Sequence, residues 1–161
     1  MGVPYYAAPA TFAMNTAYTE GWGLYAEYLG EEMGMYEDPY VLFGRLSEEM
    51  VRACRLVVDT GMHALGWSRK KAIDFMQSNT ADDVEDLVSE VNRYISIPGQ
   101  ACAYKIGEIK LRELRKLAAE KLGEKFDVRK FHDFVLTMGN MPLTTLEKQV
   151  KVFIKKQTDN L

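Results

Sequence analysis

The chain has 161 residues, of which 47% are hydrophobic and 27% are charged, with a formal net charge of -3. This length fits one domain with its own core, and the composition excludes a disordered chain. The small net charge gives no electrostatic reason to expect nucleic acid or a membrane as partner. No apolar run could span a bilayer, and the first residues lack the order of a secretory signal. Cys54 and Cys102 match no metal or redox spacing, so we expect a cytoplasmic, reduced setting.

Helical periodicity begins after residue 14 and continues to about residue 157. Residues 1–13 contain two prolines and no helical period, which predicts an extended lead-in to a single helical domain or fragment. No segment shows the alternation of a strand, so the predicted class is all-α, an irregular bundle of about seven helices. The expected helices cover residues 15–33, 39–65, 68–76, 80–95, 99–122, 127–139 and 142–157.

Capping residues and prolines set these boundaries. Asp38 followed by Pro39 is typical of a helix start. Thr80 with Asp83 resembles a capping box with a shorter acid than usual. Pro98 forces the residue before it out of helical geometry, so we expect a sharp turn there.

The first predicted helix contains two glycines, Gly21 and Gly23, each costing roughly 1 kcal/mol relative to alanine. Such glycines commonly let another backbone or a ligand come close. Glu20 and Glu27 are seven residues apart and share a helix face, with Gly23 between them. From these residues alone, a solvated acidic edge beside a tight helix crossing is favoured over a functional site.

The second predicted helix carries a polar lane of Arg52, Arg55, Asp59 and His63. The last three are four residues apart in turn, so each can contact the next. An aspartate one turn before a histidine can fix its tautomer and raise its basicity, as general acid–base and metal-ligand histidines require. The alternative is an internal salt bridge beside a structural histidine.

A third group follows the fourth predicted helix. The break at Pro98 and Gly99 is expected to place Gln100 and Tyr104 on the first turns of the next helix, where backbone N–H groups are free. Tyr104 could donate a hydrogen bond to a developing oxyanion, and Arg93 could hold a carboxylate. The alternative is a helix junction with its tyrosine in the core.

Several catalytic motifs are absent from the sequence. It contains no HExxH, no glycine-rich phosphate loop, no Gly-x-Ser-x-Gly and no CxxC. Its two histidines, His63 and His132, are too far apart to form a two-histidine zinc helix. His132 lies between two aromatic residues and is interpreted as a structural histidine.

Several segments, in order, resemble hallmarks of an uncharacterised bacterial family, domain of unknown function 885. The resemblance covers about residues 14–155. The segments are 18–27 (YTEGWGLYAE), 55–63 (RLVVDTGMH) with 66–68 (GWS), 90–94 (EVNRY) with 98–101 (PGQA) and 104–107 (YKIG), and 131–133 (FHD) with Gly139, Pro142 and Leu143.

That family resembles helical zinc peptidases of the gluzincin type, similar in plan to carboxypeptidase Taq and the angiotensin-converting enzymes. Members carry a His-Glu-x-x-x-Gly-His-His-like segment upstream of the Glu-Gly-Trp motif. In such enzymes two histidines and a later glutamate hold zinc, and another glutamate activates water. The resemblance implies that Glu20 is the third zinc ligand. It also implies that Tyr104, His63 and Arg93 face the substrate or transition state. Asp59 and Gln100 would support them.

This sequence begins after the histidine segment, so the resemblance implies the C-terminal part of a zinc-dependent peptidase domain. We expect zinc only in the full-length protein, and neither tight zinc binding nor peptidase activity from this chain alone. The expected partners are a peptide substrate in the intact enzyme and the upstream half or a second copy, because uncovered apolar surface favours association. The alternative is a non-catalytic helical interaction module or oligomeric structural protein.

Overall fold

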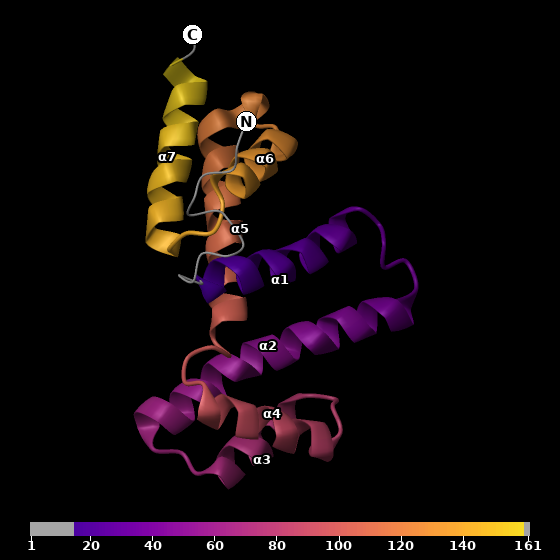
Figure 1. Cartoon of the computed structure of the whole chain (residues 1–161). Coiled ribbons are helices and arrows are strands. Elements are labelled where there is room, and N and C mark those ends of the chain that lie inside the picture. Colours follow the sequence, from indigo (N-terminus) through magenta and orange to yellow (C-terminus); the bar gives the residue numbers. More distant parts are fainter. Residues whose placement is uncertain (1–14, 160–161) are drawn as a thin grey trace.

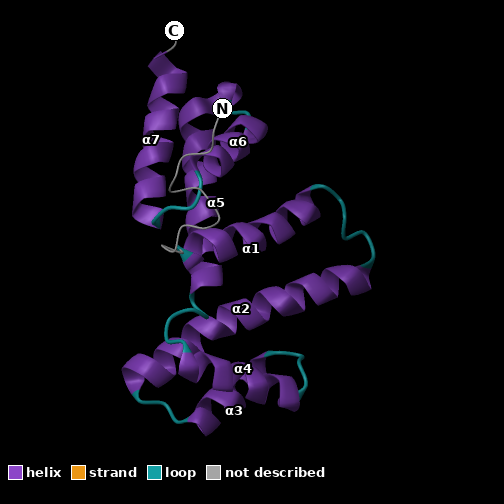
Figure 2. Ribbon diagram, in the orientation of Figure 1, coloured by secondary structure: helices purple, strands orange, loops and turns teal. Residues whose placement is uncertain are grey.

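A computed structural model describes residues 15–159, and this part of the chain folds into helices (Figure 1). Within it there are seven α-helices, one short 3-10 turn and no strand, which confirms the predicted all-α class (Figure 2). The lead-in predicted for residues 1–13 lies outside the described residues. No helix in this part is both long and apolar enough to cross a membrane. The elements are α1 (Thr16–Glu32), α2 (Pro39–Leu65), α3 (Arg69–Asn79), α4 (Val84–Ser96), α5 (Ala103–Leu122), η2 (Gly123–Lys125), α6 (Val128–Met138) and α7 (Leu143–Asp159).

Helix α5 connects two groups of helices (Figure 1). Helices α6 and α7 lie beside its C-terminal half, and α1 crosses its N-terminal half. Helix α2 turns back below α1, and α3 and α4 pack against its C-terminal half. The turn from α4 into α5 therefore lies where the two groups meet.

The hydrophobic core has two clusters that follow this division. The first cluster joins α1, α5, α6 and α7, and its most buried side chains include Tyr25, Leu111 and Phe131. The second cluster joins α2, α3 and α4, and includes Val58 and Met76. Polar side chains from both groups meet in the region between these clusters.

The start of α2 is as predicted. The Asp38 carboxylate accepts a hydrogen bond from the backbone N–H of Tyr40 at 2.8 Å, and Pro39 occupies the first helical turn. Gly66 ends the helix in the left-handed region with φ of 67°, a conformation that glycine adopts without steric cost.

The predicted capping box at the start of α4 is wrong. Thr80 is the C-terminal cap of α3, and its hydroxyl donates to the Met76 carbonyl at 2.9 Å. Asp83 precedes α4 but its side chain makes no capping hydrogen bond. A threonine hydroxyl can also bond back to a carbonyl four residues earlier, and here that local bond lengthens α3 to Asn79.

Helix α5 begins four residues later than predicted. Gly99 has φ of 81°, which a continuing right-handed helix cannot accommodate. The chain instead forms successive turns, with Gln100 N–H donating to the Ile97 carbonyl and Cys102 N–H to the Gly99 carbonyl, both at 3.3 Å. Gln100 therefore lies in the turn before α5, and Tyr104 alone lies on its first helical turn.

Helices α1 and α5 cross in backbone contact. A Cβ atom added to Gly107 would overlap the carbonyl oxygen of Ala17, and one added to Gly21 would overlap the backbone of Gly107. The close approach expected at Gly21 is thus made by α5. A Cβ added to Gly23 would meet no atom of the described chain within 4 Å.

Candidate functional site

Glu90 of α4 is the centre of a polar cluster. Its Oε2 accepts hydrogen bonds from Arg55 Nη2 at 2.8 Å, Arg93 Nη2 at 2.9 Å and the Tyr94 hydroxyl at 2.8 Å. Its Oε1 accepts from Arg93 Nε at 3.2 Å, and Arg55 Nε donates to the Tyr94 hydroxyl at 2.8 Å. We call Arg55, Glu90, Arg93 and Tyr94 the Glu90 cluster.

The neighbours of Glu90 keep its carboxylate ionised. Burial alone would raise the pKa of Glu90, but hydrogen bonds from Arg93 and Tyr94 and the charge of Arg55 outweigh it and lower the pKa to about 2. Burial raises the pKa of Tyr94 to about 12, so its hydroxyl stays protonated and donates to Glu90. At neutral pH two guanidinium groups thus share one carboxylate.

Tyr104 packs on this cluster from the start of α5. The Arg55 Cζ atom lies 4.9 Å from the centroid of the Tyr104 ring, within range of a cation–π interaction. The Arg55 side chain is only 10% exposed, so the contact is shielded from water. The hydrogen bond to Glu90 is the main factor that raises the pKa of Arg93, and Tyr104 also contributes. Tyr104 is therefore close to both arginines.

Gln100 links this cluster to α1. Arg93 Nη1 donates to Gln100 Oε1 at 2.8 Å, and Gln100 Nε2 donates to Glu20 Oε1 over a longer 3.5 Å. Because an amide has its acceptor and its donors at opposite ends, these two contacts fix its orientation. Glu20, Arg93 and Gln100 come from three separate segments, and the fold brings them together.

The Glu20 carboxylate is half-buried and has no cationic partner within residues 15–159. Its long hydrogen bond to Gln100 is its single polar contact in that part of the chain. Glutamates elsewhere in the interior have closer cations: Glu108, 2% exposed, pairs with Lys105 at 3.1 Å and with Arg112 at 3.0 Å.

Asp59 and His63 do not form the pair expected from their spacing. The Gly99 N–H donates to both Asp59 oxygens, at 3.0 and 3.2 Å, and Asp59 is buried. His63 Nε2 lies 3.0 Å from the Tyr94 carbonyl oxygen. Since a carbonyl only accepts, Nε2 carries the proton. The interpretation that Asp59 orients His63 is therefore wrong: Asp59 fixes the turn before Gln100, and the backbone of α4 orients His63.

Sequence reasoning assigned Arg93 to the site but not the other three members of the Glu90 cluster, Arg55, Glu90 and Tyr94. Glu90, Arg93 and Tyr94 follow an i, i+3, i+4 spacing that places them on one helix face, a signal that could have shown them together. The sequence shows Arg55 as a charged residue on an apolar helix. Its partners, Glu90 and Tyr94, are 35 and 39 residues further along the chain. Only the packing of α2 against α4 identifies them.

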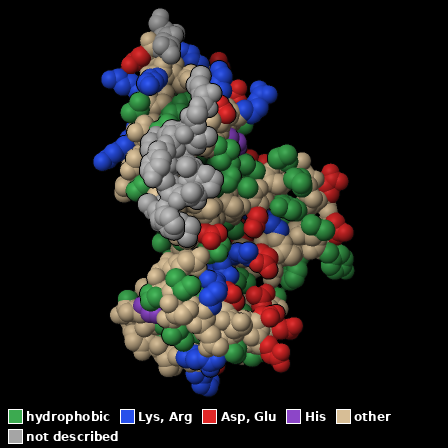
Figure 3. Space-filling view, in the orientation of Figure 1, with side chains coloured by type: hydrophobic (Ala, Val, Ile, Leu, Met, Phe, Trp, Pro, Cys, Tyr) green, Lys and Arg blue, Asp and Glu red, His purple; other side chains and the backbone are tan. Residues whose placement is uncertain are grey.

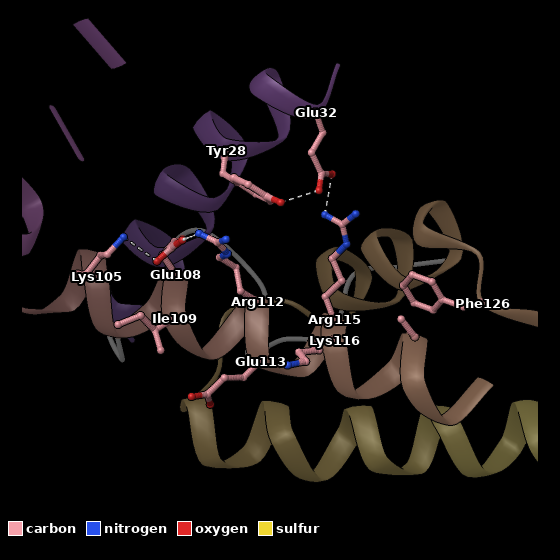
Figure 4. A pocket seen from close by; sticks show the side chains of 11 residues that line it. Tyr28, Glu32, Lys105, Glu108, Ile109, Arg112, Glu113, Arg115, Lys116 and Phe126 are labelled. Carbon is pink, nitrogen blue, oxygen red and sulfur yellow. Dashed lines mark hydrogen bonds and ion pairs between the residues drawn. The ribbon is translucent and has the colours of Figure 1, made fainter. Parts of the chain in front are cut away.

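A separate open cavity of about 570 Å³ lies along α5, and no member of the Glu90 cluster lines it (Figure 4). Tyr28 and Glu32 of α1 line one side, and Arg112 and Arg115 of α5 line another. Arg115 Nη1 and the Tyr28 hydroxyl both donate to Glu32 at 2.8 Å. Arg115 pairs with Glu32, and Arg112 pairs with Glu108, which Lys105 also contacts, so both arginines of the cavity already have a carboxylate partner.

Among residues 15–159 there is no group of three or more histidine, cysteine, aspartate or glutamate side chains arranged to hold a metal ion. Glu20 could supply one oxygen ligand, but structural and catalytic zinc sites need three or four protein ligands.

The fold and the site define an all-α domain with an arginine–carboxylate cluster between two hydrophobic cores. The chain belongs to the family DUF885, described as bacterial protein of unknown function, whose model matches residues 7–150. It is similar to a solved structure described as the "putative lipoprotein" from Colwellia psychrerythraea, with a TM-score of 0.86 and 46% identity over 88% of this chain. The match covers 24% of that protein, so this chain spans about a quarter of its length. No curated protein matches.

Proposed function

We propose that this chain forms part of the catalytic domain of a helical zinc peptidase, in which Glu20 is one of the zinc ligands. The observation that carries the proposal is the environment of the Glu20 carboxylate, which lacks a cation partner within residues 15–159 yet is joined through Gln100 to the Glu90 cluster. A carboxylate held at the edge of an ordered polar cluster is suited to a metal ion. The resemblance of the family to gluzincin peptidases supports the same role.

The remaining zinc ligands would come from polypeptide outside residues 15–159. The solved relative has about four times the matched length, which leaves ample chain to supply them. Zinc in such a site polarises the peptide carbonyl and lowers the pKa of a bound water. Gly23, one turn along α1 from Glu20, has open space around it, and this also suits the close approach of a further segment.

The side chains of this chain would bind and orient the substrate. The Tyr104 hydroxyl would donate a hydrogen bond to the oxygen on which negative charge develops, and Arg55 beneath its ring restricts the ring's position. His63 is exposed and donates through Nε2, which leaves Nδ1 as an acceptor for a substrate N–H. Asp59 would support the site indirectly, through the turn that carries Gln100.

A zinc titration of the isolated chain gives a first test. Because Glu20 is a single ligand, calorimetry is expected to show no stoichiometric tight site, and peptide hydrolysis should be absent. A tight site with one zinc per chain would contradict the assignment of the other ligands to polypeptide beyond residues 15–159.

The Colwellia psychrerythraea protein provides the second test. Replacing its residue aligned with Glu20 by alanine is expected to lower both its zinc content and any peptide hydrolysis. Replacement of the residue aligned with Glu27 serves as the control on the same helix. Unchanged zinc content and activity in the first variant would remove Glu20 from the site.

An interaction module is the second candidate function. Exposed apolar side chains lie at the start of α2 and in the loop before it. They are Tyr40, Val41 and Phe43 in the helix and Met33 and Met35 in the loop. Figure 3 shows hydrophobic side chains together with acidic ones at this end of the α1–α2 pair. Apolar side chains grouped in this way favour association with another protein surface.

A further inference from the structure

Helix α2 has apolar side chains on two of its faces. On one face Val51, Cys54 and Val58 are buried, in the cluster that α2 forms with α3 and α4. A second row of apolar side chains on the same helix is between 40% and 62% exposed. Its members, which we call the α2 seam, are Phe43, Leu46, Met50 and Val57. A helix that is apolar on more than one side is typical of a protein interior, so the α2 seam is unusual on a surface.

The spacing of the α2 seam fits a partner helix. With the half-buried Ala53, its residues follow one another at alternating steps of three and four along the chain. Such steps align the side chains in one row, and helices that pack lengthwise against each other meet along rows of this kind. From Phe43 to Val57 the row is about 21 Å long, at a rise of about 1.5 Å per residue. It can therefore accommodate about four turns of a second helix.

The positions beside the α2 seam carry little charge. They are Leu42, Ser47, Glu49, Cys54 and Leu56. Glu49 is the one charged residue of these five, and it already pairs with Arg45 at 2.9 Å and with Lys105 at 2.6 Å. Charged edges select the partner in helix pairs that exchange, whereas interfaces that never separate are more apolar and resemble a domain core cut in half. The α2 seam has the character of a permanent interface.

We propose that the α2 seam packs against a helix from the part of the longer family members that this chain does not match. The Colwellia psychrerythraea protein has the same fold over the matched part, and the match covers only 24% of it. About three-quarters of that protein is thus available to cover the seam, and folded proteins rarely leave a continuous apolar row bare. The partner helix is expected to carry apolar residues at the same alternating spacing. This packing does not depend on zinc or on Glu20.

The reactivity of a cysteine placed in the seam measures whether the seam is covered. Met50→Cys in this chain, and the same replacement of the aligned residue in the Colwellia psychrerythraea protein, are labelled with a maleimide in dilute solution. Mass spectrometry of the digested proteins assigns the label to this position and separates it from native cysteines. Labelling is expected to be at least about tenfold slower in the longer protein, because a thiol between packed helices reacts only when they separate.

Arg129→Cys is the matched control. The Arg129 side chain is 89% exposed on α6, so a cysteine there and one at the aligned position of the longer protein should react at similar rates. Leu46→Cys gives a second position in the seam, which decides the question if the Met50 variant of either protein does not fold. Circular dichroism checks the fold of each variant before labelling.

Slow labelling of the seam in the longer protein, at the same rate for every protein concentration, would support packing within one polypeptide. Labelling as fast as the control would overturn it. Protection that is lost on dilution would also overturn it, since a second copy would then be the occupant. Slow labelling of this chain at every dilution would contradict the exposure of the seam on which the inference depends.

Discussion

Gly21 of α1 and Gly107 of α5 face each other at a helix crossing so close that neither position has room for a methyl group. This crossing sets the position of Glu20, one residue before Gly21, relative to the first turn of α5 with Tyr104. The glycine pair is therefore a structural requirement for the candidate site, although it takes no part in binding.

Gly107→Ala is expected to destabilise the fold by about 2 kcal/mol or more, because the new methyl group would overlap the Ala17 carbonyl and force the helices apart. Gly23→Ala is the matched control, a glycine in a helix with open space around it. It should stabilise the chain by up to about 1 kcal/mol. Urea unfolding followed by circular dichroism measures both, and a neutral Gly107→Ala would show that the helices are not in backbone contact.

Glu90→Gln is expected to lower the free energy of unfolding by about 1–3 kcal/mol. The substitution removes the charge that holds Arg55 and Arg93 and leaves a buried guanidinium without its ion pair. Glu120→Gln serves as the control, because Glu120 is exposed and its nearest cation, Lys116, is 3.9 Å away. Equal urea midpoints for the two variants would contradict a structural role for the Glu90 cluster.

His132 is held in its neutral form by its neighbours. Arg115 Nη1 donates to the Tyr25 hydroxyl at 3.2 Å, and the same hydroxyl is hydrogen-bonded to His132 Nε2 at 2.7 Å. Burial lowers the pKa of His132, and the charge of Arg115 lowers it further. This network confirms the structural interpretation of His132.

Stability should therefore fall with acid in a defined window. The unfolded chain binds a proton near the ordinary histidine pKa of about 6.5, while the folded chain binds it only at lower pH. The stability gained from keeping His132 neutral is therefore complete above the pKa of the unfolded chain. It decreases as the pH falls below that value. Urea midpoints at pH 7 and pH 5 are expected to differ, and His132→Gln should reduce this difference. His63→Gln is the control, and an unchanged pH dependence in His132→Gln would exclude His132 as its source.

The start of α2 is expected to mediate self-association. Tyr40 is 87% exposed and Phe43 is 62% exposed, with Leu46 and Met50 further along the same helix face. Sedimentation velocity should show a coefficient that rises with protein concentration, and the double substitution Tyr40→Ser, Phe43→Ser should restore a monomer. Val152→Ser, at an exposed apolar position on α7, should have no effect. A monomer at all concentrations would refute this surface.

The helices were predictable because their caps act locally. Asp38 and Gly66 have the geometry that their residue types favour, so the boundaries of α2 followed from the sequence. The start of α5 could not be predicted from the sequence. Gly99, with φ of 81°, belongs to a turn that is fixed by Asp59, forty residues earlier. Sequence spacing could not show that the Asp59 carboxylate would prefer this backbone N–H to the neighbouring histidine.

The candidate site was predictable in part. Local motifs indicated Glu20, Arg93 and Gln100, and the fold brings these three together. The sequence did not indicate Glu90, because its role at the centre of the cluster depends on an ion pair with Arg55 of α2. Pairings between helices that are distant in sequence require tertiary packing, and one sequence contains no direct signal for them.

Anomalous diffraction at the zinc absorption edge, from crystals of the Colwellia psychrerythraea protein grown with zinc, tests the role of Glu20 most directly. A zinc ion is expected about 2.0–2.2 Å from a carboxylate oxygen of the residue aligned with Glu20, with its other ligands from the part of that protein that this chain does not match. Zinc bound elsewhere, or no zinc at that carboxylate, would contradict a metal-binding role for Glu20.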